Sequence, residues 1–276
     1  MRTGLLVGGL AVAGLLGCAG TRERPEPTEQ EVPATLSNQE LQQLGSRLAE
    51  QVTQKLGVVD APLAQQYVNA VGKQLVSSLP AEQQQFEYTF TILNDPRRIN
   101  AFSLPGGQVF VTSALLEAVT SEAELAAVLT HEIAHGAQGH LRDHAESQYG
   151  VPTLRELALG RNPEMLDQIS SEIAAQGYLA SFSREEEQAA DSMGLNLLAQ
   201  TGYTPTAMSS ALRTLAHGEQ DRSALFQFFA SHPAPDQRAQ RLEALMRERG
   251  LGGGSPALVG GFERVQAQVD AMSDVG

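Results

Sequence analysis

The sequence predicts an α+β fold that is predominantly α-helical, with one small sheet of antiparallel type beside a central helix. Apolar residues recur at helical spacing through most of the chain. Alternating β-branched and aromatic residues are confined to residues 86–112. The chain has 276 residues, of which 42% are hydrophobic and 18% charged, so it has the composition of an ordinary globular protein with ample core.

Two amphipathic helices are expected first, because apolar residues such as Leu41 and Leu48 recur at helical spacing. Three strands follow them, and a Pro105-Gly106-Gly107 turn joins the second strand to the third. After a central helix, residues 146–163 contain glycines and prolines that predict a loop or short helices. The expected strands lie at residues 86–93, 99–104 and 108–112, and the expected helices outside the centre at residues 38–56, 62–78, 164–180, 184–201, 205–217, 224–231 and 235–249.

The central helix is predicted to begin at Ser121 as N-cap, with Glu124 as its capping-box partner. It carries the string HEIAH at residues 131–135. Residues four apart lie on one face of a helix, so His131 and His135 can hold one metal ion, and Glu132 lies beside them. HExxH is the zinc metallopeptidase signature, with two His ligands and a carboxylate as general base. The alternative is an amphipathic helix with surface histidines.

A hydrolytic zinc site needs three protein ligands and one position open to water. The HExxHxxGxxH pattern does not continue here, since position 138 is Gln and position 141 is Leu. Three consecutive glutamates on a later helix are the next candidates. We favour Glu187, four residues before Asp191, because the two carboxylates then share a helical face. One can bind the single zinc ion, and the other can accept the remaining N–H of a ligand His. The alternative is a solvated acidic face.

Further stretches match a known pattern around these motifs. Glu187 and Asp191 form E-x-x-x-D, residues 100–107 form a strand–turn–strand ahead of the motif helix, and His232-Pro233 with Arg238 forms H-P-x-x-x-x-R. Together with HEIAH, these elements resemble the M48 family of metallopeptidases. That family includes bacterial lipoprotein proteases, membrane-embedded relatives and a mitochondrial stress protease.

The resemblance covers about residues 40–248. It implies a zincin-like metallopeptidase fold with one zinc ion per chain, bound by His131, His135 and Glu187. Glu132 would be the catalytic base, and Asp191 would support a ligand histidine.

His232 is also assigned to the catalytic machinery, with its role left open. It can donate to the oxyanion of a tetrahedral intermediate. In similar periplasmic proteins, a His at this position is thought to approach zinc and hold the enzyme latent. A purely structural role is the alternative. His140 and His144 form another pair four residues apart, but Asp143 is not placed as Glu132 is. We interpret them as surface residues or neighbours of the ligands, with an extra metal site as the alternative.

The N-terminus is interpreted as a targeting segment. Residues 4–16 are apolar but too short for a comfortable membrane span. They lead into Leu15-Leu16-Gly17-Cys18, which resembles a bacterial lipobox in which Cys18 carries lipid. Because Ala19 follows rather than Asp, we expect an outer-membrane anchor facing the periplasm. An ordinary secretory signal with an incidental cysteine is the alternative. Cys18 is the only cysteine, which excludes an intramolecular disulfide.

Four segments are therefore expected along the chain. They are a lipoprotein signal peptide at residues 1–17, the lipidated Cys18 and a flexible tether at residues 18–37, the catalytic domain at residues 38–249, and a Gly-rich linker with a short helix at residues 250–276. The net charge of −13 disfavours nucleic acid and anionic lipid surfaces as partners.

The expected function is that of a zinc metalloendopeptidase in the bacterial cell envelope. The resemblance implies quality control, in which misfolded or unassembled envelope proteins are the polypeptide substrates. We expect the substrate to lie extended along the sheet edge near residues 108–112, and residues 146–163 to lie over the site. One alternative is a chaperone-like lipoprotein that binds clients with little proteolysis. Another is a lipoprotein scaffold with incidental zinc.

Overall fold

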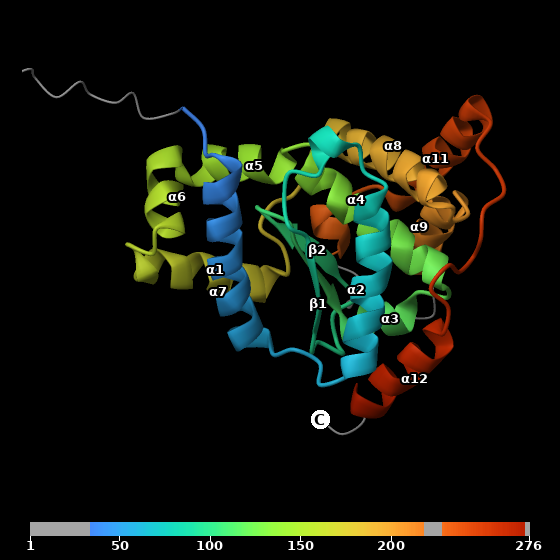
Figure 1. Ribbon diagram of the computed structural model, residues 1–276, viewed down its shortest axis with the longest axis horizontal. Coiled ribbons are helices and arrows are strands. Elements are labelled where there is room, and N and C mark those ends of the chain that lie inside the picture. Colours follow the sequence, from blue (N-terminus) through green and yellow to red (C-terminus); the bar gives the residue numbers. More distant parts are fainter. Residues whose placement is uncertain (1–33, 218–227, 274–276) are drawn as a thin grey trace, which may run out of the picture. The chain divides into compact units, whose positions relative to one another are not determined.

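The computed structural model describes residues 34–217 and 228–273 (Figure 1). The predicted signal peptide, Cys18 and most of the predicted tether lie outside these residues, as does half of the helix expected at residues 224–231. The fold class is confirmed: helices dominate, and three strands form one small sheet. The elements are α1 Asn38–Leu56, α2 Pro62–Ser77, η1 Ala81–Gln83, β1 Thr89–Leu93, β2 Ala101–Leu104, β3 Gln108–Thr112, α3 Ser113–Ala118, α4 Glu122–Ala137, α5 His140–Tyr149, α6 Val151–Ala158, α7 Pro163–Gln176, α8 Arg184–Thr201, α9 Ala207–His217, α11 Pro235–Arg249 and α12 Phe262–Ser273.

The sheet has the strand order β1-β3-β2 and is mixed. β2 runs antiparallel to β3, with Ala101 opposite Val111, as predicted for the hairpin. β1 runs parallel to β3, with Thr89 opposite Gln108, so the expectation of an antiparallel sheet is wrong for this pair. After β1, residues 94–100 lead to the far edge of the sheet. The hairpin then returns the chain between the two edge strands, so β3 has the direction of β1.

This order places β3 in the middle of the sheet, hydrogen-bonded on both sides. The expectation of a sheet edge at residues 108–112, along which substrate would lie, is therefore wrong for this strand, because β3 has no free edge. The outer edge of β1 is partly paired with Val58, which bridges to Leu93. Among the described residues, no strand pairs with the outer edge of β2.

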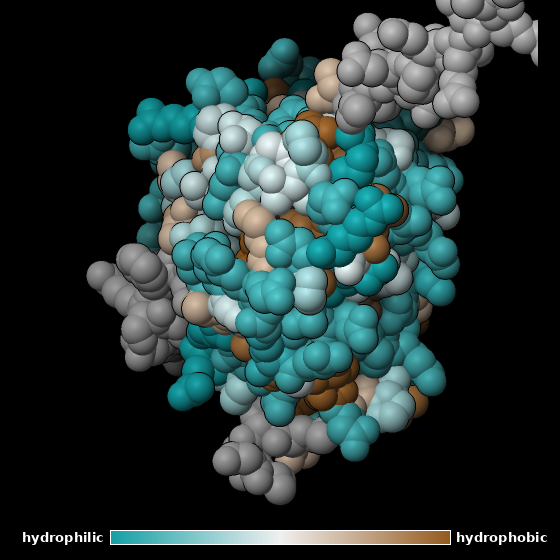
Figure 2. Space-filling view, turned by 90° about the vertical axis from the view of Figure 1, so that its left-hand side faces the viewer, coloured by the Kyte–Doolittle hydropathy of each residue, from teal (hydrophilic) through white to brown (hydrophobic). Residues whose placement is uncertain are grey.

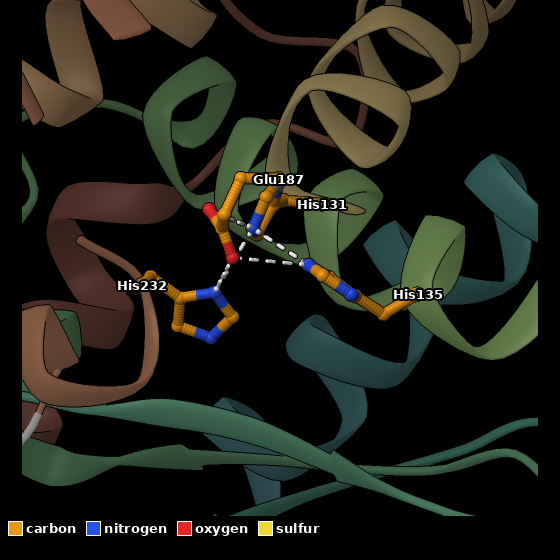
Figure 3. Close-up of side chains that lie close together, drawn as sticks. All are labelled: His131, His135, Glu187 and His232. Atoms are coloured by element: carbon orange, nitrogen blue, oxygen red, sulfur yellow. Dashed lines mark hydrogen bonds and ion pairs between the residues drawn. The ribbon is translucent and has the colours of Figure 1, made fainter. Parts of the chain in front are cut away.

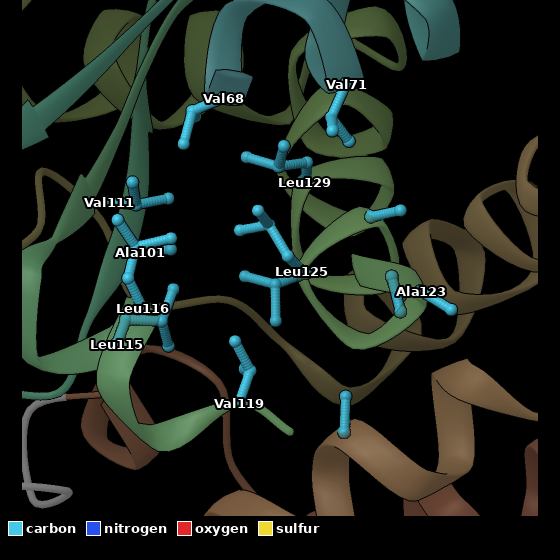
Figure 4. Close-up of a cluster of buried hydrophobic side chains, with 14 of the residues drawn as sticks. Val68, Val71, Ala101, Val111, Leu115, Leu116, Val119, Ala123, Leu125 and Leu129 are labelled. Carbon is cyan, nitrogen blue, oxygen red and sulfur yellow. The ribbon is translucent and has the colours of Figure 1, made fainter. Parts of the chain in front are cut away.

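Each face of the sheet packs against its own group of helices. Ala101 and Val111 point to the side of α2, α3 and α4, where they meet Leu125 and Leu129 in the larger core (Figure 4). On the other face, the Phe102 and Phe110 rings stack 5.1 Å apart and pack against α1, α6 and α7. Successive side chains of a strand point to opposite faces of the sheet, so strands of only four or five residues contribute to both cores. β2 is thereby fixed beside α4.

Residues 146–163 form the end of α5, all of α6 and the first residue of α7, joined by Gly150 and residues 159–162, so the prediction of short helices is confirmed. Their apolar side chains, such as Leu154 and Leu157, are buried against α1 in the second core. The expectation that this segment lies over the HEIAH motif is therefore wrong, because its amphipathic faces are used to cover the far side of the sheet. The outer surface on this side of the molecule is mostly hydrophilic, with small separate hydrophobic patches (Figure 2).

The segment expected as a Gly-rich linker lies along the N-terminal end of α4. Backbone N–H groups of Leu258, Val259 and Gly260 donate to the carboxylate of Glu122. α12 follows and packs against α2 and α3 through residues such as Val269. In the described part of the chain, no helix is long and apolar enough to cross a lipid bilayer.

Candidate metal centre

The helix that carries HEIAH is held from all sides. Every residue of α4 from Glu122 to His135 is buried, which is typical of a central helix with no solvent face. Ser121 is the N-cap, as predicted, and accepts from the Glu124 backbone N–H. The Glu124 carboxylate does not complete a capping box, however. It reaches one residue further back, where it accepts from the N–H and the hydroxyl of Thr120.

α8 packs closely against α4 at Gly194. A Cβ at Gly194 would lie 3.2 Å from Met208 Cε and 3.5 Å from the backbone nitrogen of His131. The first of these contacts is tight and the second is ordinary, so the two helices lie close together at the first ligand candidate and leave little room for a side chain larger than a methyl group. The start of α8 is fixed by a capping box between Ser183 and Glu186. The acidic face of α8 is thus aimed at the HEIAH face of α4.

Four buried side chains converge between these helices: His131 and His135 from α4, Glu187 from α8, and His232 from the segment before α11 (Figure 3). Within the described residues this is the group whose donor atoms lie within 4.8 Å of one another. His131 Nε2 lies 3.2 Å from His135 Nε2 and 3.5 Å from Glu187 Oε2, and Glu187 Oε1 lies 3.4 Å from His135 Nε2. A tetrahedral metal with bonds of ~2.0–2.1 Å requires ligand atoms about 3.3 Å apart. The spacings between side chains are close to this value, with the two Glu187 distances measured to different oxygens, so the donor set is compatible with a metal ion.

His232 lies inside this cluster. Its Nδ1 is 3.2 Å from His131 Nε2 and 2.8 Å from Glu187 Oε1, and its Nε2 is 3.3 Å from Glu132 Oε1. The other oxygen of Glu132 accepts a hydrogen bond of 2.9 Å from the Ser103 hydroxyl on β2. Glu132 is thus held between the strand and His232, directly beside the donor cluster.

The outward nitrogen of His131 is held by α8 and α11. His131 Nδ1 lies 3.2 Å from Asp191 Oδ1, as expected for a carboxylate four residues after Glu187. Arg238 donates to both oxygens of Asp191, at 2.9 and 2.7 Å, and lies 2.5 Å from Glu187 Oε2. Burial by itself raises the pKa of Asp191, but the charge and hydrogen bonds of Arg238 hold it well below its usual range. Asp191 is therefore an ionised acceptor.

The outward nitrogen of His135 faces α5. His140 Nδ1 lies 3.0 Å from His135 Nδ1, whereas His144 Nε2 pairs with Glu186 at 2.9 Å. The two histidines therefore have different partners. They are not among the residues whose donor atoms converge in the described part of the chain, so the alternative of an extra metal site is not supported.

Burial and charge set the protonation of the cluster. Burial lowers the pKa of His135 to about 3, which leaves a neutral ring. Burial acts to raise the pKa of Glu132, but the charge and hydrogen bond of His232 outweigh it and bring the pKa to about 2. Burial acts to lower the pKa of His232, yet Glu187 and Glu132 raise it to about 9. The two carboxylates thus favour a positive charge between them, either a protonated ring or a metal ion.

Residues 177–183, which join α7 to α8, lie against this cluster. The ring of Phe182 is 3.7 Å from that of His135 and 5.4 Å from that of His232, between ring centroids. Its backbone N–H donates to the carbonyl of Ser231. Glu132 and His232 are each only 1% exposed. Phe182 therefore lies over the ligand candidates, where residues 146–163 were expected.

Comparison with known proteins identifies the arrangement. The sequence profile of peptidase family M48 matches residues 62–246, which include all of the converging side chains. The chain belongs to peptidase family M48.

Curated relatives of this M48 chain include proteases of bacteria and mitochondria. The beta-barrel assembly-enhancing protease of Escherichia coli (strain K12) is 33% identical over 214 residues, which is 74% of this chain and 43% of that protein. The mitochondrial metalloendopeptidase OMA1 of Schizosaccharomyces pombe is 30% identical over 182 residues, 66% of this chain and 53% of that protein. Metalloprotease LoiP of Escherichia coli (strain K12) is 29% identical over 156 residues, 55% of this chain and 61% of that protein. The match takes in less than two thirds of each relative.

The sequence alone did not assign three contacts of this M48 site. Arg238 stood in a motif, but no spacing rule connected it to Asp191 and Glu187. Ser103 lies in a strand pattern, where a hydroxyl carries no signal. His140 was left as a neighbour without a partner, although Gly139 directly before it marks the end of the preceding helix.

Proposed function

We propose that this M48 chain is a zinc metalloendopeptidase. The observation that carries the proposal is the convergence of His131, His135 and Glu187 at tetrahedral spacing with Glu132 directly beside them. Neutral imidazoles and a carboxylate are a donor set that suits zinc. HExxH on a helix is its usual peptidase context.

When bound, zinc supplies a Lewis acid that polarises the scissile carbonyl and lowers the pKa of an adjacent water towards ~7. Glu132 takes a proton from the attacking water as the C–O bond forms. It then gives that proton to the leaving amine as the C–N bond breaks. Ser103 holds one oxygen of Glu132, so the other oxygen is the one that faces the cluster. Asp191, fixed by Arg238, keeps His131 aimed at the metal.

His232 is proposed as a reversible latch. Its Nδ1 lies among the three ligand candidates, so four protein donors surround the metal position. Catalytic zinc sites keep one position open, whereas sites with four protein ligands are closed. With His232 in the cluster the enzyme is latent. With His232 displaced, its N–H is available to the oxyanion of the intermediate.

The substrates are proposed to be extended segments of misfolded or unassembled envelope proteins. The name of the beta-barrel assembly-enhancing proteases supports an envelope location, as do the apolar N-terminal residues and the lipobox-like site at Cys18. We place the substrate along the outer edge of β2, since Ser103 of this strand contacts Glu132. The lipid on Cys18 would anchor the domain to the outer membrane, facing the periplasm.

The test uses purified protein with its bound metal quantified, and casein as an unfolded substrate. We expect one zinc per chain in wild type and in Glu132→Gln, cleavage by wild type but not by Glu132→Gln, and faster cleavage by His232→Ala than by wild type. Zinc without cleavage by wild type or His232→Ala would favour the client-binding alternative. Absence of zinc from wild type would contradict the metal site itself.

A further inference from the structure

His140 lies beside a ligand candidate because the chain stops being one helix. α4 ends at Ala137, and Gly139 then adopts a left-handed conformation with φ of 81° before α5 begins at His140. In a continuous helix, a residue five positions after His135 would point about 140° away from it. Gly139 redirects the backbone, and no heavy atom lies within 4 Å of where its Cβ would be. The turn therefore depends on backbone conformation, which glycine supplies without strain.

The resulting contact is between the two Nδ1 atoms, which are 3.0 Å apart. The rings are nearly perpendicular, at 67°, with centroids 5.0 Å apart. Two imidazole nitrogens at this distance share one proton, so one must donate and the other accept. His135 Nε2 faces His131 and Glu187, and must be bare to bind a metal. The proton of neutral His135 is therefore on Nδ1, directed at His140.

The two ligand histidines of α4 are thus supported in matching ways from opposite sides. His131 has its Nδ1 beside Asp191 of α8, and His135 has its Nδ1 beside His140 of α5. Asp191 accepts through a carboxylate oxygen, which is a common partner of a ligand histidine, whereas His140 accepts through an unprotonated ring nitrogen.

We propose that His140 is a positioning residue for the metal site: its Nδ1 accepts the N–H of His135 and so fixes the tautomer and direction of that ligand. The inference rests on the proposed metal site. His140 does not bind the metal itself and acts only through His135. Phe182 packs against both rings and holds the pair in place, with its centroid 6.3 Å from that of His140.

The chain supplies a matched control in His144. It lies one turn further along α5, is partly buried like His140, and contacts Phe182 at 5.5 Å between centroids. Its hydrogen-bond partner is Glu186 rather than a ligand candidate. Both variants therefore lose an imidazole of α5 and its contact with Phe182, but only His140→Ala loses a contact with a ligand candidate.

The experiment measures the zinc dissociation constant of the full chain by competition with a chelator. We expect His140→Ala to bind zinc roughly 10–100-fold more weakly than wild type, as for loss of other partners of ligand histidines. His140→Asn places an amide oxygen near the position of Nδ1 and should restore affinity to within about threefold of wild type. His144→Ala should bind as wild type does. Absorption spectra of the Co²⁺-substituted proteins should change for His140→Ala only.

Unchanged zinc affinity and Co²⁺ spectrum in His140→Ala would overturn this inference alone, while the proposed function stands. Wild-type protein that binds no zinc would overturn both. The melting temperature of each metal-free variant shows whether it is as stable as wild type. Equal loss of zinc affinity in His140→Ala and His144→Ala would make the effect merely structural and would overturn the inference. Should His140→Ala not fold, His140→Leu replaces it, and equal zinc affinity of His140→Leu and His140→Asn would overturn the inference.

Discussion

Glu122 and Glu132 are two carboxylates on the same helix, ten positions apart and each only 1% exposed, yet their surroundings differ completely. Glu122 accepts from the hydroxyls of Tyr67 and Tyr203 and from three backbone N–H groups of residues 258–260. Glu132 accepts one hydroxyl hydrogen bond, from Ser103, and otherwise faces histidines.

The comparison shows that two equally buried carboxylates on one helix can have different roles, one structural and one proposed to be catalytic. A buried carboxylate whose acceptor sites are filled by fixed donors is a structural joint, here between α4, α2, the segment after α8 and the C-terminal segment. A buried carboxylate with few donors keeps a lone pair for a proton. Burial by itself therefore does not distinguish a catalytic residue, but the number and kind of donors does.

The largest expected difference is in peptidase activity. Glu132→Gln should lower the rate of casein cleavage by roughly 10²–10⁴-fold, because the general base is lost. Glu122→Gln should stay within about tenfold of wild type when assayed well below its melting temperature, since it touches no reacting group. Rates measured with equal zinc content in all samples check this. A Glu122→Gln protein as inactive as Glu132→Gln would contradict the assignment of Glu122 as structural and Glu132 as catalytic.

Stability should show the reverse order. Glu122→Gln removes a charged acceptor from five hydrogen bonds and should lower the free energy of unfolding by about 2–3 kcal/mol. Glu132→Gln should lower it by less than about 1 kcal/mol, because few donors lose their partner. Urea unfolding of the two variants measures both values. A greater loss for Glu132→Gln would contradict our view of Glu122 as the structural joint.

Removal of single donors should sharpen the contrast. Ser103→Ala leaves Glu132 without its hydroxyl donor and should lower kcat about fivefold, corresponding to about 1 kcal/mol, with zinc content unchanged. Tyr203→Phe removes one donor of Glu122 and should cost about 1 kcal/mol of stability without a change in kcat. Parallel kinetic and unfolding measurements decide whether the two effects separate.

The smallest expected effect is on pH dependence. Burial acts to raise the pKa of Glu122, but hydrogen bonds from Tyr203, Val259, Tyr67 and Leu258 hold it below its ordinary value of 4.5. The unfolded chain then binds more protons than the folded one just below pH 4.5, so this contribution is fully present above that pH and is lost as the pH falls. Unfolding of metal-free wild type and Glu122→Gln between pH 3 and 7 should give a smaller loss for the variant at the acidic end. Identical profiles would contradict it.

Much of the fold and the centre of the site could be predicted because the signals are local. The HEIAH string, the pair Glu187 and Asp191, and the N-cap at Ser121 depend on spacing within one helix, which the backbone repeat fixes. Helix α8 runs from Arg184 to Thr201, as its residues predicted. Local geometry of this kind does not depend on what the helix packs against.

Tertiary structure alone decided the contacts between elements. The parallel pairing of β1 with β3, the burial of α6 against α1, and the approach of Phe182 to His135 each join segments whose separation the sequence pattern does not constrain. The same is true of Arg238, which reaches Asp191 from 47 residues away. Such contacts depend on which elements pack together in the folded chain, and the repeat of residues within one helix or strand does not determine this.

His140 and Glu122 show most clearly what the sequence determined and what only the tertiary structure decided. The sequence by itself determined that His131 and His135 share a helical face, because four residues make about one turn. Whether a third histidine five residues on points towards them or away depended on where the helix ends and how Gly139 turns. For Glu122, only the returning C-terminal segment supplied the donors that make it structural. Helical periodicity thus places residues on one element, while the partners that fix their chemistry come from elsewhere in the chain.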